Sequence, residues 1–414
     1  MTILFSIAAT LNLPIKKLIL SRIFVTGMGI ITAIGDGVAA NRDALIKGKS
    51  GISDLTLFPS KYAGILPCAE VKITTDSLKK SLNACEPGVT RTSLLSLQAL
   101  KEAIEDTGLS QEELSKGSTA LIGASTVGGM CLTDELYHDA NKSENGSEYL
   151  ASYDCGSVNI YLQAKYKIGG IINTINTACS SSANAIMYGA RLIKNGLARK
   201  AIVGGADSLA KFTINGFKSL HILSDEKCRP FDKDRKGLNL GEGAAFLVLE
   251  KEEDIAGRKV YAEITGHGNS NDAFHPSSIS DEGDGPYLSM KTALDAAGID
   301  QSEISFINAH GTATENNDET ESRAMIKLFG TPPPFASTKS YTGHTLGAAG
   351  AVEAVYSILS LYYQELYPSL QFTNPIESTG LIPGLSYSSS RLKHVMSNSF
   401  GFGGNCSSLI FSKS

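Results

Sequence analysis

The chain has 414 residues, of which 42% are hydrophobic and 19% charged, a composition typical of a folded globular protein. Its length exceeds what one hydrophobic core usually serves, so two domains or two halves of one large fold are expected. A net charge of −5 and the lack of any lysine- or arginine-rich run argue against nucleic-acid binding.

The first 21 residues are predicted to be an N-terminal extension, with the folded body starting near Arg22. Lys16 and Lys17 interrupt its apolar stretch, no basic region precedes it, and it is too short to span a bilayer. We therefore expect neither a signal peptide nor a membrane anchor, and no other stretch of membrane length.

The cysteines and histidines are scattered along the chain. The seven cysteines form no CxxC pair, which indicates reduced thiols in a cytoplasmic protein. The seven histidines include no HExxH or HxH motif, and none lies near a cysteine at zinc-ligand spacing. The sequence therefore predicts no metal ion in the chemistry.

The folded body opens over residues 22–35 with a β-branched run that closes in glycines, which predicts a strand followed by a turn. A helical pattern follows over residues 94–114 and is broken at Gly108, a typical helix C-terminus. Residues 118–125 are short and apolar, as expected of a buried strand.

The same order of elements returns in the second part of the chain. Residues 259–270 predict a strand that runs into glycines, and residues 288–304 predict a helix broken at Gly298. Residues 305–313 then predict a buried strand that leads into a polar loop. The two helices also share a similar ending, EDTGLSQEEL in one and DAAGIDQSEI in the other.

Two small-residue-rich helices, predicted over residues 179–193 and 346–361, form a third matching pair. These echoes favour a duplicated α/β protein whose apolar strands are covered on both faces. The halves would span residues 22–255 and 256–414, with the boundary at the charged turn EKEEDIAGRK. The sequence has no Walker loop and no GxGxxG motif after the first strand, so it gives no support for nucleotide binding.

Cys179 stands where a polar loop meets the first of these helices. Free backbone N–H groups and the helix dipole at such a position lower the pKa of a thiol from about 8.5. We therefore expect a thiolate to be available near neutral pH. A single cysteine is more often a buried structural residue, and it is the presence of two particular histidines that favours a nucleophile here.

These histidines are His310, in INAHGTAT, and His344, in STKSYTGHTLGAAGA. Both lie in predicted loops rich in Gly, Thr and Ser, where backbone N–H groups and hydroxyls can approach a ligand closely. Lys339 lies five residues before His344 and Glu353 lies nine residues after it. A Lys–Glu pair would support this loop, although a surface lysine is the simpler interpretation of Lys339 alone.

The segment SNSFGFGGNCS, residues 397–407, places two phenylalanines among glycines. Glycines leave the backbone free to present N–H groups, and a tight turn between two final strands is an equally good interpretation from these residues alone.

Together these segments resemble the β-ketoacyl-acyl carrier protein synthases of the elongating Cys-His-His class, in the thiolase superfamily. The likeness rests on TACSSS, PFDKDRKGLNLGEGAAFLVLE, NAHGTAT, STKSYTGHTLGAAGAVEA and NSFGFGG in this order, and it covers the chain from Arg22 to Phe411. It implies an α/β thiolase-like fold, a five-layered α-β-α-β-α sandwich of two duplicated halves.

By this resemblance, Cys179 accepts the acyl group, while His310 and His344 promote decarboxylation and stabilise the resulting enolate. Lys339 matches the lysine of the family motif, and Glu353 matches its electrostatic partner.

Three further assignments follow from the same resemblance, and a fourth, Phe217, is a separate prediction from the segment NGFKSL. Thr312 and Thr314 fall where family members bind the pantetheine arm. Phe402 falls at the gate, where its backbone N–H and that of Cys179 would form an oxyanion hole. Phe217 is predicted to line the acyl pocket, and a core aromatic is an equally good interpretation.

The implied reaction is a decarboxylative Claisen condensation of an acyl group on Cys179 with malonyl-acyl carrier protein, giving 3-oxoacyl-carrier protein and CO2. No cofactor is implied beyond the 4'-phosphopantetheine of the acyl carrier protein partner. The functional unit would be a homodimer, or a heterodimer with a subunit like a chain-length factor.

The chain departs from the family pattern at Asn405 and Cys406, where the family has Thr and Asn, and at Glu315, where it has Pro. Residues 52–93 also match poorly. These differences leave the pathway open between fatty-acid synthesis and a specialised product such as an aryl polyene or polyketide. The competing functions are those of a non-catalytic chain-length partner subunit and of a thiolase acting on CoA esters.

Overall fold

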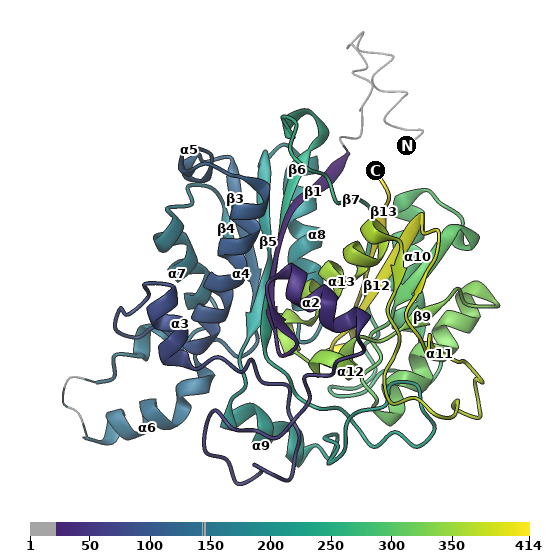
Figure 1. Cartoon of the computed structure of the whole chain (residues 1–414), viewed down its shortest axis with the longest axis horizontal. Coiled ribbons are helices and arrows are strands. Elements are labelled where there is room, and N and C mark those ends of the chain that lie inside the picture. The colour runs from purple at the N-terminus through teal and green to yellow at the C-terminus, as the bar shows by residue number, and fades with distance from the viewer. Residues whose placement is uncertain (1–21, 143, 145) are drawn as a thin grey trace.

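The computed structural model describes residues 22–142, 144 and 146–414. The predicted N-terminal extension, residues 1–21, lies outside the described residues. Figure 1 shows the earlier half of the chain, coloured purple to teal, beside the later half, coloured green to yellow.

The first half contributes a five-stranded part of the sheet, in the order β4-β3-β5-β6-β1. Its strands are β1 (Ile23–Thr32), β3 (Thr119–Ala124), β4 (Ile172–Ile175), β5 (Lys200–Asp207) and β6 (Gly243–Lys251). β3 pairs in parallel with β4 and β5, whereas the pairs β5–β6 and β6–β1 are antiparallel.

The second half repeats this arrangement in the order β9-β8-β12-β13-β7. Its strands are β7 (Ala262–Asn271), β8 (Ile304–Asn308), β9 (Phe335–Ala336), β12 (His394–Phe400) and β13 (Asn405–Ser412). β8 pairs in parallel with β9 and β12, and β12–β13 and β13–β7 are antiparallel. The order and the direction of the strands are therefore the same in both halves, and the two parts join where Phe24 and Val25 of β1 pair with β7.

A Gly-x-Gly pair on the first strand of each half fits an outer helix closely. In β1, a Cβ at Gly29 would lie 2.0 Å from the carbonyl oxygen of Ala99 in α4 (Arg91–Thr107). In β7, a Cβ at Gly268 would lie 2.1 Å from the carbonyl oxygen of Ser289 in α10 (Asp284–Ala297). Both strands therefore need glycine for the same helix-to-strand approach, and this second shared feature confirms the predicted duplication; the boundary at residue 255 stays a prediction.

The helices make three of the five layers. α4 and α7 (Ser157–Tyr166) cover the five strands of the first half, and α10 and α11 (Glu315–Phe329) cover the five strands of the second half. Between these two layers of strands, α8 (Ser181–Lys194) packs against α13 (Ala349–Tyr363). The predicted α-β-α-β-α sandwich is thus confirmed. The shorter elements are β2 (Gly35–Asp36), α2 (Val38–Ile46), α3 (Thr75–Ser81), α5 (Gln111–Ser115), α6 (Thr133–Lys142), α9 (Lys211–Ser219), α12 (Lys339–Thr342), β10 (Glu365–Leu366) and β11 (Ser388–Ser389).

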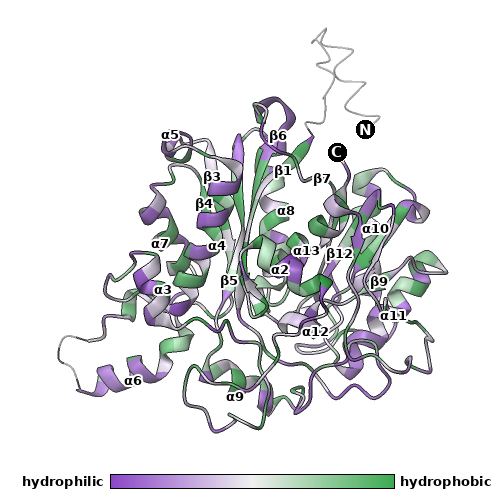
Figure 2. Ribbon diagram, in the orientation of Figure 1, coloured by the Kyte–Doolittle hydropathy of each residue, from purple (hydrophilic) through white to green (hydrophobic). Residues whose placement is uncertain are grey.

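The central helix corrects one expectation. Leu346–Tyr363 is long and apolar enough to cross a membrane by length and composition, so the prediction of no further stretch of membrane length is wrong. In the fold, 89% of that window is buried, because both faces of α13 lie against sheets or against α8. Figure 2 shows the contrast with α6, which is mostly hydrophilic.

Candidate active site

Cys179 lies in a tight turn between β4 and α8. Ala178, just before it, has a φ of 53°, a left-handed conformation that is costly for a residue with a Cβ. Ser181 holds the turn, since its hydroxyl accepts from the Thr177 N–H at 2.9 Å and donates to the Ala178 carbonyl at 2.5 Å. These two hydrogen bonds of Ser181, a residue in the first turn of α8, hold the loop in shape and place Cys179 at the start of the central helix.

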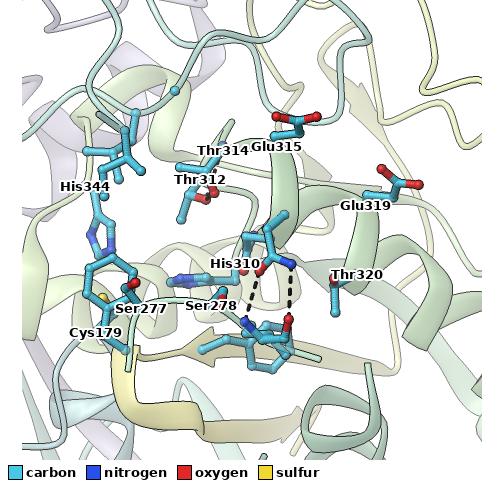
Figure 3. Close-up of a pocket in the computed structure, with 18 of the residues that line it drawn as sticks. Cys179, Ser277, Ser278, His310, Thr312, Thr314, Glu315, Glu319, Thr320 and His344 are labelled. Atoms are coloured by element: carbon cyan, nitrogen blue, oxygen red, sulfur yellow. Dashed lines mark hydrogen bonds between the residues drawn. The ribbon is translucent and has the colours of Figure 1, made fainter. Parts of the chain in front are cut away.

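The structure brings Cys179, His310 and His344 together from three separate loops. His310 follows β8, and His344 lies between α12 and the turn Leu346–Ala348. One side-chain ligand atom from each of the three residues lies within 4.8 Å of the others, and all three side chains are buried. Figure 3 shows Cys179 and His344 together at one end of a pocket, with His310 beside them.

Both imidazoles are held in one tautomer. Nδ1 of His344 accepts from the backbone N–H of Leu346 at 3.1 Å, which places the proton on Nε2. That Nε2 is buried and has no hydrogen-bond partner among the described residues. Nδ1 of His310 lies 3.2 Å from Nζ of Lys339, an ammonium that can only donate, so His310 also carries its proton on Nε2.

Burial keeps these two imidazoles neutral. It lowers the pKa of His310 and of His344 well below 6.5, and the charge of Lys339 lowers both further. At neutral pH the site therefore holds two neutral imidazoles, each with an N–H donor at Nε2.

Lys339 and Glu353 form a buried ion pair beneath the histidines. Lys339 is 2% exposed, and its Nζ also donates to the carbonyl oxygen of His310 at 2.6 Å. Because one ammonium contacts Nδ1 and the backbone of the same histidine, the pair fixes both the ring and the loop that carries it. The interpretation of Lys339 as a surface residue is wrong.

The thiol of Cys179 differs from the sequence-based expectation. Burial raises its pKa to about 11, although the charge of Lys339 and the backbone N–H of Phe402 act in the opposite direction. The prediction of a thiolate at neutral pH is therefore wrong for this state, because desolvation of the sulfur outweighs its position at a helix start.

This pKa predicts a steep pH dependence of alkylation. The rate at which iodoacetamide alkylates Cys179 should rise about tenfold per pH unit between pH 7 and 9, because the thiolate fraction grows tenfold per unit below the pKa. The site of alkylation is read by peptide mass spectrometry, with the exposed Cys85 of the same sample as the internal reference. A rate that levels off above pH 7 would show that the thiol ionises as the sequence predicted.

Phe402 lies on a glycine-rich loop that touches the nucleophile turn, here called the gate loop (residues 401–404). A Cβ at Gly401 would lie 2.7 Å from the carbonyl oxygen of Thr177 and 3.2 Å from the backbone nitrogen of Cys179, so only glycine fits. The ring of Phe402 stacks on Phe217, with centroids 5.9 Å apart, and the backbone N–H of Phe402 acts to lower the pKa of the Cys179 thiol.

A cavity of about 650 Å³ opens in front of these groups. Of the nine predicted site residues, seven line it, namely Cys179, Phe217, His310, Thr312, Thr314, His344 and Phe402, while Lys339 and Glu353 lie behind. The hydroxyls of Thr312 and Thr314 are 2.8 Å apart. Figure 3 shows these threonines between His310 and Glu315, on the side of the pocket away from Cys179.

Two buried carboxylates that support the histidine loops were not predicted from the sequence. Glu321 of α11 accepts from the backbone N–H groups of His310, at 2.9 Å, and Gly311, at 2.8 Å. Asp207, at the end of β5, accepts at 2.7 Å from the backbone N–H of Gly347, which lies three residues after His344. Asp318 and Glu321, three residues apart on one helix face directly after the GTAT loop, were the available signal for the first carboxylate.

Comparison with known proteins adds to this geometry. Residues 20–255 match the family model "Beta-ketoacyl synthase, N-terminal domain", and residues 261–373 match "Beta-ketoacyl synthase, C-terminal domain". The chain belongs to the β-ketoacyl synthase family. The 3-oxoacyl-(acyl-carrier-protein) synthase 2 of Vibrio cholerae is 35% identical over 420 residues, which cover 95% of this chain and 99% of the relative. The enzyme of the same name from Staphylococcus aureus is 31% identical over 419 residues, which cover 95% of this chain and 98% of the relative.

Solved ketosynthases share the whole fold with this β-ketoacyl synthase. The ishigamide ketosynthase/chain length factor has a TM-score of 0.89 at 30% identity, and covers 95% of this chain and 99% of its own. A ketosynthase in complex with its chain length factor from Xenorhabdus doucetiae has a TM-score of 0.82 at 33% identity, and covers 95% and 98%. The predicted family, the thiolase-like fold and the class of enzyme, an acyltransferase, are confirmed.

Proposed function

We propose that this chain condenses an acyl group, held as a thioester on Cys179, with malonyl-acyl carrier protein to give 3-oxoacyl-carrier protein and CO2. The observation that carries the proposal is the pair of neutral imidazoles, His310 and His344, each with its proton on Nε2, at the buried thiol. A non-catalytic partner subunit has no use for this arrangement.

The first step is acyl transfer. Sγ of Cys179 attacks the carbonyl carbon of the acyl-pantetheine thioester, a new C–S bond forms, and the bond to the pantetheine sulfur breaks. The thiol proton leaves with the pantetheine sulfur. The backbone N–H groups of Cys179 and Phe402 stabilise the oxyanion, and loss of one such donor typically costs about a hundredfold or more in rate.

The second step is decarboxylation of the malonyl group. Its thioester oxygen accepts from Nε2–H of His310 and of His344, the bond to the carboxylate breaks, and CO2 leaves while the electron pair stays as an enolate. The enolate carbon then attacks the acyl carbonyl on Cys179. The sulfur leaves and takes up a proton from solvent, which regenerates the thiol.

Two threonines on the cavity wall suit the pantetheine arm that presents these substrates. The hydroxyls of Thr312 and Thr314 lie in the cavity wall, where they would bind the amides of the 4'-phosphopantetheine of an acyl carrier protein. This arm supplies the thioester and arrives with the partner. The absence of a metal ion stays a prediction, as does a cytoplasmic location.

We infer that the functional unit pairs two ketosynthase-fold chains, either two copies of this chain or this chain with a chain-length-factor-like subunit. β4 is the last strand of its sheet in the described part of the chain, four residues before Cys179. An edge strand of this kind is a ready template for a partner strand. Two relatives were solved as ketosynthases with a chain length factor, which supports the second form.

The proposed function is tested by intact-protein mass spectrometry after incubation with acyl carrier proteins that bear saturated, unsaturated or aryl chains. Acylation followed by condensation with malonyl-carrier protein is expected. Loading with saturated chains alone would place the enzyme in fatty-acid elongation. Loading with polyene or aryl chains alone, or only with a partner subunit, would place it in specialised polyketide synthesis.

Two outcomes would overturn the proposal. No loading by any chain would favour the non-catalytic subunit. Cleavage of 3-oxoacyl-CoA by free CoA, without any use of malonyl groups, would favour the thiolase.

A further inference from the structure

The proposed oxyanion hole takes its two N–H donors from opposite halves of the duplicated fold. Cys179 belongs to the turn before α8 in the first half, whereas Phe402 belongs to the gate loop between β12 and β13 in the second. Both donors must point at one oxygen atom, and errors of about 1 Å in such a site typically cost about a hundredfold in rate. The fold therefore needs a contact that fixes the gate loop against the nucleophile turn.

Asn405 makes such a contact directly after the gate loop. Its side-chain oxygen lies within hydrogen-bond distance of three donors, Oγ of Ser180 at 2.8 Å, Nδ2 of Asn184 at 2.8 Å and Nδ2 of Asn269 at 2.9 Å. The Ser180 hydroxyl shares its one proton between this oxygen and the Thr177 carbonyl oxygen, also at 2.8 Å. Ser180 follows the nucleophile, and Asn184 lies in the first turn of α8. One amide oxygen of the second half thus holds the turn and the helix of the first.

The backbone of Asn405 completes the link to the gate loop. Its carbonyl oxygen accepts from the Gly401 N–H at 2.8 Å, which closes the loop that carries Phe402. Gly401 in turn packs against Thr177 and Cys179, where no Cβ fits. Asn405 therefore binds the nucleophile turn through its side chain and the gate loop through its backbone.

We propose that Asn405 is a positioning residue that keeps the Phe402 N–H in register with Cys179 during acyl transfer. This role rests on the proposed function, since it presupposes that the two N–H groups form the oxyanion hole. Asn405 is also one of the positions where the chain departs from the family pattern, and the proposal assigns a structural role to that difference.

The test compares two reactions of one sulfur atom. Acylation by octanoyl-pantetheine passes through an oxyanion, whereas alkylation by iodoacetamide forms an S–C bond with loss of iodide and builds no oxyanion. In Asn405→Ala, we expect the ratio of acylation rate to alkylation rate at Cys179 to fall at least tenfold from the wild-type ratio. An unchanged ratio would overturn the proposal, whether the two rates stay constant or fall together.

Further variants keep the test decisive. Ser180→Ala removes a donor instead of the acceptor, and it should lower the ratio even if Asn405→Ala does not fold. In the double variant the two losses should not add, as expected for partners in one contact. Asn405→Thr, which retains an oxygen acceptor, should recover most of the ratio.

Asn195→Ala is the matched control, because this asparagine lies at the far end of α8 and, among the described residues, its side chain donates only to the carbonyl oxygen of Arg191. It should leave the ratio unchanged. If a saturated chain does not load but an unsaturated or aryl chain does, the pantetheine thioester of that chain replaces octanoyl-pantetheine in the ratio. If no chain of the panel acylates the wild-type protein, the proposed function fails first and the role of Asn405 falls with it. Wild-type acylation with an unchanged variant ratio refutes the role of Asn405 alone.

Discussion

Replacing Cys179 with alanine should abolish acyl loading and lower the rate of condensation by at least about a thousandfold. One ligand atom from each of Cys179, His310 and His344 lies within 4.8 Å of the others, and Cys179 is only 6% exposed. Without it there is no sulfur to hold the acyl group between the two steps. Intact-protein mass spectrometry after incubation with acyl-carrier protein measures the loss.

The same variant should retain decarboxylation of malonyl-carrier protein within about tenfold, because both Nε2–H donors remain in place. The matched control is Cys85→Ala, which removes an exposed thiol and should leave loading unchanged. Undiminished loading of Cys179→Ala would instead show that another residue accepts the acyl group.

The sequence predicted the parts of the site that depend on local segments. Gly108 and Gly298 end their helices in the left-handed conformation, with φ of 70° and 67°, as the breaks in the helical pattern indicated. The small-residue helices proved to be the central pair, α8 and α13. Seven of the nine predicted site residues line one cavity. Six of them lie in loops that follow a strand or precede a helix, whereas Phe217 lies within α9.

Features that depend on distant contacts could not be read from the chain. The pKa of Cys179 is set by how completely the gate loop and the two histidine loops exclude water, a property of the assembled site. Asp207 supports a loop that lies 140 positions away, and Asn405 contacts Asn184 across 221 positions. A polar residue at a strand end predicts some hydrogen bond, and only the fold shows with which partner.

Replacing both His310 and His344 with alanine should lower malonyl decarboxylation by at least about a thousandfold and acyl loading by much less. Each imidazole offers the enolate oxygen an Nε2–H. Lys339 fixes this tautomer of His310, and the backbone N–H of Leu346 fixes that of His344. Loading relies on the backbone donors of Cys179 and Phe402, which stay in place. Decarboxylation is followed by CO2 release, and loading by mass.

The pH dependence separates this role from one in which a charged imidazole acts. Since the pKa of both groups lies well below 6.5 in the folded protein, each is already neutral at pH 8 and stays neutral at pH 6. The decarboxylation rate should therefore not rise as the pH falls between these values. Burial raises the pKa of Glu321 and of Glu353 to about 7, so their protonation accounts for any loss of rate in this range. The control is His138→Ala, a change on the exposed surface of α6. Decarboxylation that survives the double replacement, or a rate that rises as the pH falls with an apparent pKa near 6.5, would show that the two histidines do not act as neutral donors.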